Sequence, residues 1–467
     1  MTRRTLLAAA ALAPFAAQVR AETAFPTHRP TPSKRKFTSP AVEQQLVQIK
    51  AQIKDPELAW MFENCYPNTL DTTVNFEKNN GVPDTFVITG DIDAMWLRDS
   101  SAQVWPYLPL AKNDPALREM LEGLIRRQTQ CILIDPYANA FMPDRTSAPL
   151  SWAVHDVTDK HPGVGERKWE IDSLCYPIRL AYGYWKNTGD TAPFDATWHK
   201  AMRTVLQTFR DQQRRNSPGP YKFQRRSDTP TETQFLGGYG NPTRKVGLIH
   251  SMFRPSDDAC LYPLFIPANL FAVTALGWLR QMAVEVTKDP VLGLDCAELS
   301  MEVLSALEQF DHIPTPAGDI WAYEVDGYGN QLFMDDANAP GLLSLAYLGC
   351  CSAEDPVYQR TRARAWSSSN PYFFKGIAAE GIGGPHEGLR MIWPMSIIMR
   401  ALTSSDDREI AAALATLKRT HAGTGFIHES FDQDDPKHFT REWFAWANTL
   451  FGELIVKISQ TRPHLLL

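Results

Sequence analysis

The densest polar motif of the sequence is GDIDAMWLRDSS, at residues 90–101. Asp91, Asp93, Trp96, Arg98 and Asp99 fall within nine residues of one another. Charged groups this close together are costly to bury unless they pair or bind a polar ligand. Carboxylates accept and guanidinium groups donate hydrogen bonds in fixed directions, which suits sugar hydroxyls. An ion pair between Arg98 and Asp99 at the start of a helix explains single residues, but not the whole cluster.

A second motif, FRPSDDA at residues 253–259, places two adjacent aspartates before an apolar segment. Ser256 and one aspartate form an ordinary helix N-cap. Successive residues at a helix entrance point in different directions, so the other aspartate is free to face a cavity. A carboxyl that is partly desolvated or close to other negative charges keeps its proton at neutral pH, as a general acid must. Asp257 and Asp258 are therefore candidates for a general acid.

The third motif, GFIHESF at residues 425–431, places Glu429 in a predicted loop. Aromatic residues surround it in sequence, which favours the wall of a pocket over a solvated surface: Phe426, Phe431, Phe439, Trp443, Phe444 and Trp446. Two carboxylates from separate loops of such a pocket are the minimum for glycoside hydrolysis. One protonates the glycosidic oxygen, and the other activates water or attacks the anomeric carbon.

Four shorter segments also place carboxylates beside aromatic or glycine residues, and each of them could equally be a cap or a turn. They are 170–172, 323–329, 333–338 and 383–388. Motifs of other enzyme classes are missing from the sequence, among them GxSxG, HExxH, the Walker motif and GxGxxG after a strand. The eleven histidines show no persuasive metal-ligand spacing.

The apolar spacing is mainly 3.6-like, which predicts about a dozen helices. We expect them at 41–53, 100–111, 114–133, 172–187, 197–214, 262–287, 297–310, 339–349, 354–366, 389–402, 406–420 and 443–459. A short strand at 84–89 precedes the first polar motif. Polar loops that recur after every second helix favour an all-α (α/α)6 toroid, with short irregular strands in the loops. An irregular helical bundle is the alternative, and no 30–50-residue repeat supports a helical array.

The N-terminus has the pattern of a bacterial signal peptide. Arg3 and Arg4 precede an apolar run, and small residues lead up to a cleavage site after Ala21. The paired arginines resemble a twin-arginine signal. We therefore expect a signal peptide at 1–21, an extended arm at 22–40, a single catalytic domain at 41–467, and a periplasmic or secreted protein. No later stretch is apolar enough to insert into a membrane after cleavage.

Composition excludes several classes of protein. At 44% hydrophobic, the 467-residue chain can bury a large core, which rules out wholesale disorder. A formal net charge of −6 argues against a nucleic-acid partner. The seven cysteines form no CxxC pair, so we expect mainly buried free thiols. The oligomeric state stays open, with a monomer slightly favoured.

Long stretches of the sequence resemble glycoside hydrolase family 125. The stretches that carry the resemblance are FVITGDIDAMWLRDSSAQVWP from residue 86, FRPSDDA from 253, LFMDDAN from 332 and HESF from 428. The resemblance covers roughly residues 40–460. It implies an (α/α)6 barrel and an exo-acting, inverting α-1,6-mannosidase that acts on mannose-containing glycans without a metal or other cofactor.

The resemblance also implies roles for individual residues. It places a general acid in the RPSDD segment, where we prefer Asp257 to Asp258, and a general base at Glu429. The expected substrate-binding residues are Asp91, Asp93, Trp96, Arg98, Asp99, His250, Arg254, Asp258, Asp335 and Asn338. Inversion requires the two catalytic carboxyls to lie roughly 6.5–9.5 Å apart. The alternatives are an α-glycosidase of other specificity, a polysaccharide lyase, and a non-catalytic carbohydrate-binding protein.

Overall fold

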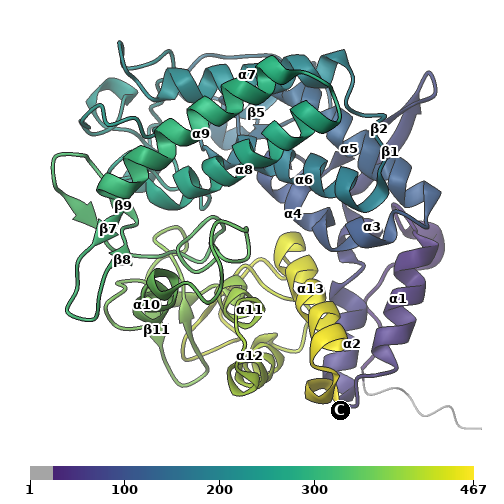
Figure 1. The fold of residues 1–467 in the computed structure, drawn as a ribbon. Coiled ribbons are helices and arrows are strands. Elements are labelled where there is room, and N and C mark those ends of the chain that lie inside the picture. Colours follow the sequence, from purple (N-terminus) through teal and green to yellow (C-terminus); the bar gives the residue numbers. More distant parts are fainter. Residues whose placement is uncertain (1–24) are drawn as a thin grey trace, which may run out of the picture.

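The computed structural model describes residues 25–467, which form a mostly helical ring (Figure 1). The predicted signal peptide therefore lies outside the described residues. The α-helices are α1 (Pro40–Lys50), α2 (Pro56–Cys65), α3 (Asn68–Thr72), α4 (Leu97–Val104), α5 (Pro115–Ile134), α6 (Asp172–Thr188), α7 (Ala196–Gln212), α8 (Ile266–Glu285), α9 (Pro290–Phe310), α10 (Pro356–Ala365), α11 (Pro394–Leu402), α12 (Asp407–Thr420) and α13 (Ala445–Thr461).

Five of these helices form the inner wall of the ring. α4 packs on α6 and α6 on α8, while α11 packs on α13 and α13 on α4. Every residue of α4 is buried, as expected for a helix that is surrounded on all sides. Its serines are satisfied internally, because the Gln128 side chain donates to the hydroxyls of Ser100 and Ser101 at 2.9 Å each. The predicted (α/α)6 architecture is confirmed.

The outer helices begin differently from the inner ones. Their N-caps are side chains that accept backbone N–H groups: Ser39 for α1, Asp55 for α2, Asp114 for α5, Asp195 for α7, Asp289 for α9, Asp355 for α10 and Asp406 for α12. Proline follows directly in most cases, at a position that needs no donor. The inner helices α4, α6, α8, α11 and α13 begin after an apolar residue, with no side-chain cap.

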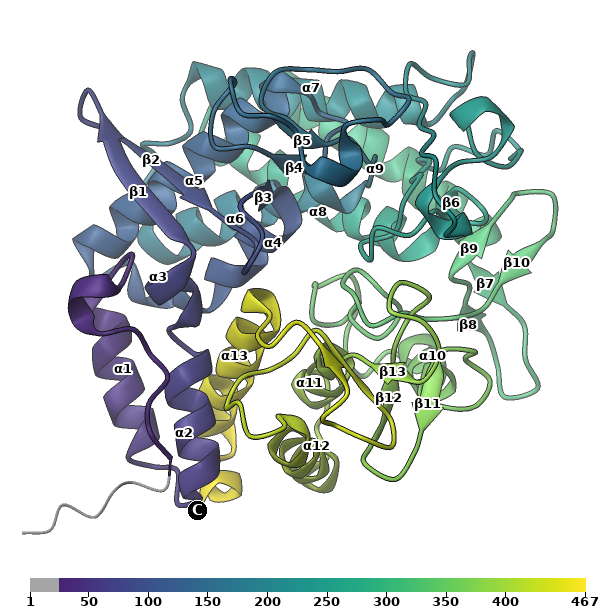
Figure 2. The same cartoon turned by 180° about the vertical axis from the view of Figure 1, so that it is seen from behind.

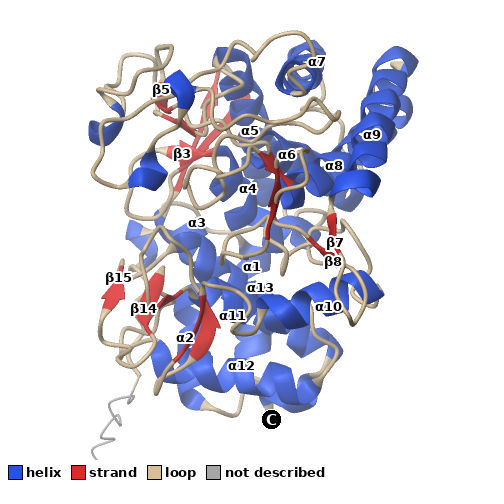
Figure 3. Ribbon diagram, turned by 90° about the vertical axis from the view of Figure 1, so that its left-hand side faces the viewer, coloured by secondary structure: helices blue, strands red, loops and turns tan. Residues whose placement is uncertain are grey.

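The strands are short and antiparallel, and they lie in the connections between helices. They are β1 (Val74–Asn79), β2 (Val82–Val87), β3 (Met95–Trp96), β4 (Ala140–Phe141), β5 (Val164–Glu166), β6 (Leu264–Phe265), β7 (His312–Ile313), β8 (Ile320–Trp321), β9 (Glu324–Val325), β10 (Gln331–Leu332), β11 (Phe373–Lys375), β12 (Glu380–Ile382), β13 (Met391–Ile392), β14 (Ser430–Asp432) and β15 (Phe439–Thr440). The sheets β3–β4–β5 and β13–β14–β15 lie on the side of the molecule opposite α8 and α9 (Figure 3).

The chain closes on itself where α13 packs against α2, α3 and α4 (Figure 2). This contact joins the last helix to the N-terminal quarter of the chain. The arm before α1 is held down as well, because Arg29 is ion-paired with Asp71 at 2.7 Å and bonded to Glu43. Among the described residues, no helix has the length and apolarity needed to cross a membrane.

One predicted helix is wrong, and two helices were not predicted. Residues 341–349 form successive turns in place of the expected helix at 339–349. The buried carboxylate of Asp335 accepts the backbone N–H groups of Leu342 and Leu343, and Ser344 Oγ accepts that of Gly341. These side chains fix the backbone at the start of the turn segment. The unpredicted helices α2 and α3 are short, at ten and five residues.

We predict that the α13 closure depends on Gly452. A Cβ at this position would lie 2.9 Å from the Cα of Tyr66 and 2.7 Å from its Cδ2. Gly452→Ala should therefore cost about 1–3 kcal/mol of stability through overpacking. Gly277→Ala on α8 is the matched control, because no atom lies within 4 Å of its Cβ. The control should stabilise by up to about 1 kcal/mol.

The thermal unfolding midpoint, followed by circular dichroism, checks both variants. The expected order is Gly452→Ala below wild type and Gly277→Ala at or above it. A Gly452→Ala midpoint equal to that of wild type would show that the closure tolerates a wider separation of α13 from α2.

Candidate active site

A cavity of about 1160 Å³ opens among the loops that precede the inner helices. Six of the predicted site residues line it: Trp96, Arg98, Asp99, Asp257, Asn338 and Glu429. The small sheets deliver several of the groups at its wall. Trp96 ends β3, Glu166 ends β5, and Glu429 directly precedes β14.

The guanidinium of Arg98 is the electrostatic centre of this cavity. It is fully enclosed, and its Nη1 lies 2.5 Å from Glu170 and 3.1 Å from Asp172. Its Nε is 3.6 Å from Asp99, and its Nη2 is 3.8 Å from Asp257. Burial, opposed by the Arg98 charge, raises the pKa of Asp99 and of Asp172 to about 6 each. One arginine thus holds four carboxyl groups together.

Asp257 and Glu170 form a carboxyl pair within this group. Both carboxyls contact the guanidinium of Arg98, Glu170 at 2.5 Å from Nη1 and Asp257 at 3.8 Å from Nη2, so they are neighbours in one acidic cluster. Burial and the charges of Asp257 and Asp172 hold the pKa of Glu170 well above its usual range, in spite of Arg98. Burial acts in the same direction on Asp257, but Lys168, Arg98 and Glu170 outweigh it and lower the pKa of Asp257. Glu170 is therefore the more readily protonated carboxyl of the two.

The backbone at Asp257 is in the left-handed region, with φ of +68°. That conformation is rare for a residue with a side chain and has to be imposed by its surroundings. Lys168 Nζ donates to the Asp257 carbonyl at 2.8 Å, and Asn139 Nδ2 donates to its carboxylate at 3.1 Å. Both contacts fix the carboxyl at the cavity wall.

Glu429 lies at another part of the same wall, with its own set of partners. Arg441 Nη1 donates to its carboxylate at 3.1 Å, and Thr440 Oγ1 donates at 3.3 Å. The Glu387 carboxyl is also close enough to interact with it electrostatically. Burial and the charge of Glu429 raise the pKa of Glu387 to about 7, against the opposing effect of His386. Glu429 is thus surrounded by hydrogen-bond donors when Glu387 carries its proton.

His386 carries a positive charge between the two parts of the wall. Burial lowers the pKa of its imidazole, but the carboxylates of Asp258, Asp257 and Glu429 outweigh this effect and raise the pKa to about 9. The imidazole lies 3.8 Å from Asp258, which is itself fully buried. Asp258 therefore contacts the site through His386 and does not line the cavity.

Aromatic rings form much of the remaining lining, at the starts of α4, α11 and α13. They are Trp96, Trp393, Phe444 and Trp446. The indole nitrogens of Trp96 and Trp393 are buried without a hydrogen-bond partner. An indole N–H that lacks a protein acceptor is suited to donate to a ligand oxygen.

Two predicted binding residues of the first motif point away from the cavity. Asp91 and Asp93 are exposed and do not line it. Asp91 instead forms an ion pair with Arg441, the residue that donates to Glu429. Asp91 therefore acts on the site only through Arg441.

Three further predicted residues are buried in the structure around the cavity. His250 is bonded to Thr243 and to the carbonyl of Gln212, and burial lowers its pKa to about 3. Arg254 is ion-paired with Glu324 at 2.7 Å. The Asp335 carboxylate caps the turns at 342 and 343. None of the three lines the cavity.

Sequence reasoning missed several residues of the wall. Asn139 and Lys168 stand in segments without a recognisable motif, so nothing in the sequence singled them out. Arg441 follows the third motif closely, but no role was predicted for it. Glu170 and Glu387 belong to segments noted above, but their pairing with Asp257 and Glu429 depends on the tertiary fold. Across residues 25–467, no group of three or more His, Cys, Asp or Glu side chains is arranged to hold a metal ion.

Comparisons with known proteins give a consistent result. The family model of the metal-independent α-mannosidases, GH125, matches residues 55–456. The meiotically up-regulated gene 157 protein of Schizosaccharomyces pombe is 44% identical over 462 residues, covering 94% of this chain and 90% of that protein.

Solved structures agree with this match. A metal-independent α-mannosidase of Streptococcus pneumoniae, in a non-productive complex with α-1,6-mannobiose, superposes with a TM-score of 0.87. It is 41% identical and covers 91% of this chain and 100% of its own. A bacterial glucoamylase complexed with acarbose has a TM-score of 0.52 at 12% identity, over 92% of this chain and 58% of its own, and shares the fold alone. The chain belongs to the GH125 family of metal-independent α-mannosidases, which are glycoside hydrolases.

Proposed function

We propose that the protein is an exo-acting, inverting α-mannosidase that removes non-reducing terminal α-1,6-linked mannose. Asp257 is the general acid and Glu429 is the general base. The observation that carries this assignment is that both carboxyls line one cavity from separate loops, each beside a second carboxyl whose pKa is raised. Asp257 has a proton available from its partner, and Glu429 is surrounded by donors.

The acid side of the reaction uses the proton shared by Glu170 and Asp257. Glu170 passes its proton to Asp257, and Asp257 gives it to the glycosidic oxygen as the bond to the anomeric carbon breaks. Both carboxyls are then ionised, and Arg98 and Lys168 offset the added negative charge. This route lets Asp257 serve as an acid although its own pKa is low.

The base side of the reaction centres on the ionised Glu429. A water molecule attacks the anomeric carbon from the face opposite the leaving group, and Glu429 removes its proton. Arg441, Thr440 and protonated Glu387 hold the carboxylate in place. Exchange with solvent then removes the proton from Glu429 and returns one to the pair of Glu170 and Asp257.

Support for the substrate comes from the family and from the cavity lining. The Streptococcus pneumoniae relative was solved with α-1,6-mannobiose. Trp96, Arg98, Asp99, Trp393 and Asn338 line the wall between the two carboxyl pairs and supply donors, acceptors and apolar ring faces. These groups would hold the terminal mannose. Five other predicted residues do not line the cavity and would instead hold neighbouring residues in place: Asp91, His250, Arg254, Asp258 and Asp335.

Hydrolysis of mannobioses tests the proposed activity. Incubation with the α-1,2-, α-1,3- and α-1,6-linked disaccharides should release mannose fastest from the α-1,6 isomer. A reducing-end-labelled α-1,6-mannotriose should lose one mannose at a time, as followed by chromatography. Labelled mannose that appears from the outset, before labelled mannobiose has accumulated, would indicate cleavage of the internal bond. No release from any isomer would favour a carbohydrate-binding protein.

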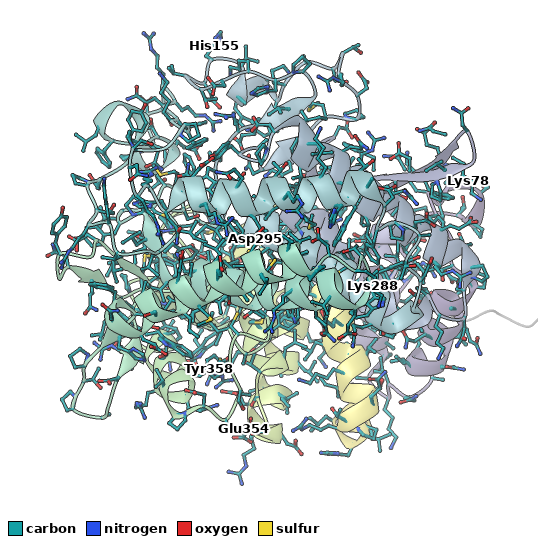
Figure 4. The ribbon with its side chains drawn as sticks, turned by 45° about the horizontal axis from the view of Figure 1, so that its top comes forward. Lys78, His155, Lys288, Asp295, Glu354 and Tyr358 are labelled. Carbon is teal, nitrogen blue, oxygen red and sulfur yellow. The ribbon has the colours of Figure 1, made fainter. Side chains whose placement is uncertain are left out.

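Substitution of the two carboxyls tests their roles. Asp257→Asn and Glu429→Gln should each lower kcat for α-1,6-mannobiose by about 10²–10⁴-fold, the usual contribution of a general acid or base. Glu354→Gln is the matched control, since this exposed residue lies far from the cavity-lining loop that carries His155 (Figure 4). If either active-site variant retained more than about a tenth of the wild-type kcat, the corresponding role would be wrong.

We also predict that Glu170→Gln moves the alkaline limb of the pH profile. Glu170 holds the pair's proton because its pKa is raised, so in the wild type the acid stays loaded until the pH rises through that pKa. A glutamine cannot hold this proton, and its amide would donate to ionised Asp257. The alkaline limb of kcat/KM should therefore shift to lower pH, with activity falling at neutral pH. An alkaline limb at the wild-type pH would show that Asp257 is loaded without Glu170.

A further inference from the structure

Trp152 has an unusual setting that the proposed chemistry does not use. It lies in a 3-10 turn, Ser151–Ala153, between β4 and β5, and its side chain lines the cavity. The residue is 46% exposed. A tryptophan left this open on a globular protein calls for an explanation, because burying its ring would remove a large apolar area from water.

The exposed ring is nevertheless held in a fixed orientation. Its Nε1 donates to Glu166 Oε1 at 3.0 Å, and Glu166 is only 3% exposed. The same carboxylate oxygen accepts from Arg225 Nη2 at 2.8 Å. A buried, charge-assisted acceptor therefore anchors the polar edge of the indole and leaves its apolar surface open to the cavity.

The anchor also fixes the ring relative to the proposed acid. Asn139 Nδ2 donates both to Glu166 Oε2 at 3.0 Å and to Asp257 Oδ1 at 3.1 Å. Glu166 and Asn139 thus connect Trp152 to Asp257 through hydrogen bonds. A general acid lies beside the glycosidic oxygen that it protonates, so the leaving-group sugar extends from that oxygen on the acid's side. Trp152 lies on this side of the site.

The groups around Trp152 suit a neutral sugar better than a charged ligand. Arg225 is already paired with Asp156 at 2.6 Å and with Glu166 and Glu232, so it offers no free positive charge to an anion. Ser227 and Thr229 add hydroxyls to the same part of the lining. His155, three residues after Trp152, lies at the outer edge of the molecule (Figure 4). Because Trp152 is 46% exposed, the platform lies at the solvent end of the cavity.

We propose that Trp152 is the stacking platform for the leaving-group sugar, the neutral hexose that receives the transferred proton when an oligomannoside is cleaved. The apolar C–H face of a pyranose would pack on the indole, and its hydroxyls would stay free to bond to polar groups of the lining such as Ser227 and Thr229. The inference rests on the proposed function, because the leaving-group side is defined by Asp257. It assigns Trp152 the selection of an oligosaccharide over a monosaccharide glycoside.

Binding to an inactive enzyme tests the platform without involving the acid. In the Glu429→Gln background, isothermal titration calorimetry compares α-1,6-mannobiose with methyl α-mannoside, which lacks the second sugar. Adding Trp152→Ala should weaken mannobiose binding by about tenfold, as removal of a central aromatic contact typically does. Methyl α-mannoside should lose far less affinity. Adding Trp152→Phe should keep most of the mannobiose affinity, since a ring remains.

Val154→Ala is the matched control, because Val154 lies on the same loop, is 45% exposed and does not line the cavity. In the Glu429→Gln background, Val154→Ala should leave the affinities for α-1,6-mannobiose and for methyl α-mannoside unchanged. Unchanged mannobiose affinity in Trp152→Ala, or equal weakening of both ligands, would overturn the platform. A Trp152→Phe variant as weak as Trp152→Ala would also overturn it, since the bond to Glu166 would then be what matters. If the Glu429→Gln enzyme with Trp152 intact bound neither sugar, the proposed function itself would be contradicted.

Discussion

The active-site wall depends on the buried guanidinium of Arg98. One fully enclosed cation contacts Asp99, Glu170, Asp172 and Asp257, so the four carboxyls carry more negative charge than it can neutralise. Lys168 adds a second cation near Asp257. Isolated buried charges are strongly unfavourable, and the cluster lowers this cost by keeping at least one carboxyl protonated. The raised pKa of Glu170 favours a proton on this carboxyl, close to Asp257, which is where a glycoside hydrolase needs one.

The helical ring places this cluster through the way its helices begin. Outer helices are closed by aspartate or serine caps, so their N-termini need no further partner. The inner helices begin after Trp96, Ile171, Phe265, Trp393 and Phe444, and no side chain caps them. The first turns of α4 and α6 carry Arg98, Asp99 and Asp172, and those of α11 and α13 adjoin the aromatic lining of the cavity. The open ends of the inner helices are thus where the polar groups of the cavity gather.

The local sequence pattern was sufficient to predict the architecture and the segments that form the site. It was not sufficient to predict the contacts between the side chains of the site. Helical periodicity predicted most of the helices of the ring. It failed at 341–349, where the chain forms turns and the Asp335 carboxylate accepts two backbone N–H groups. The motifs at residues 253–259 and 425–431 led to Asp257 and Glu429. His250 and Arg254 belong to the same stretch, yet Gln212 and Glu324 hold them in buried contacts that no local pattern reveals. Glu170 and Glu387 gain their significance only from their partners in space.

The anomeric form of the first product tests the central claim most directly. Proton NMR during cleavage of α-1,6-mannobiose distinguishes the two anomers of the released non-reducing mannose before they equilibrate. Water activated by Glu429 attacks opposite the bond protonated by Asp257, so β-mannose should appear first and α-mannose later by mutarotation. Initial α-mannose would contradict the single-displacement account and would require one of the two carboxyls to act as a nucleophile.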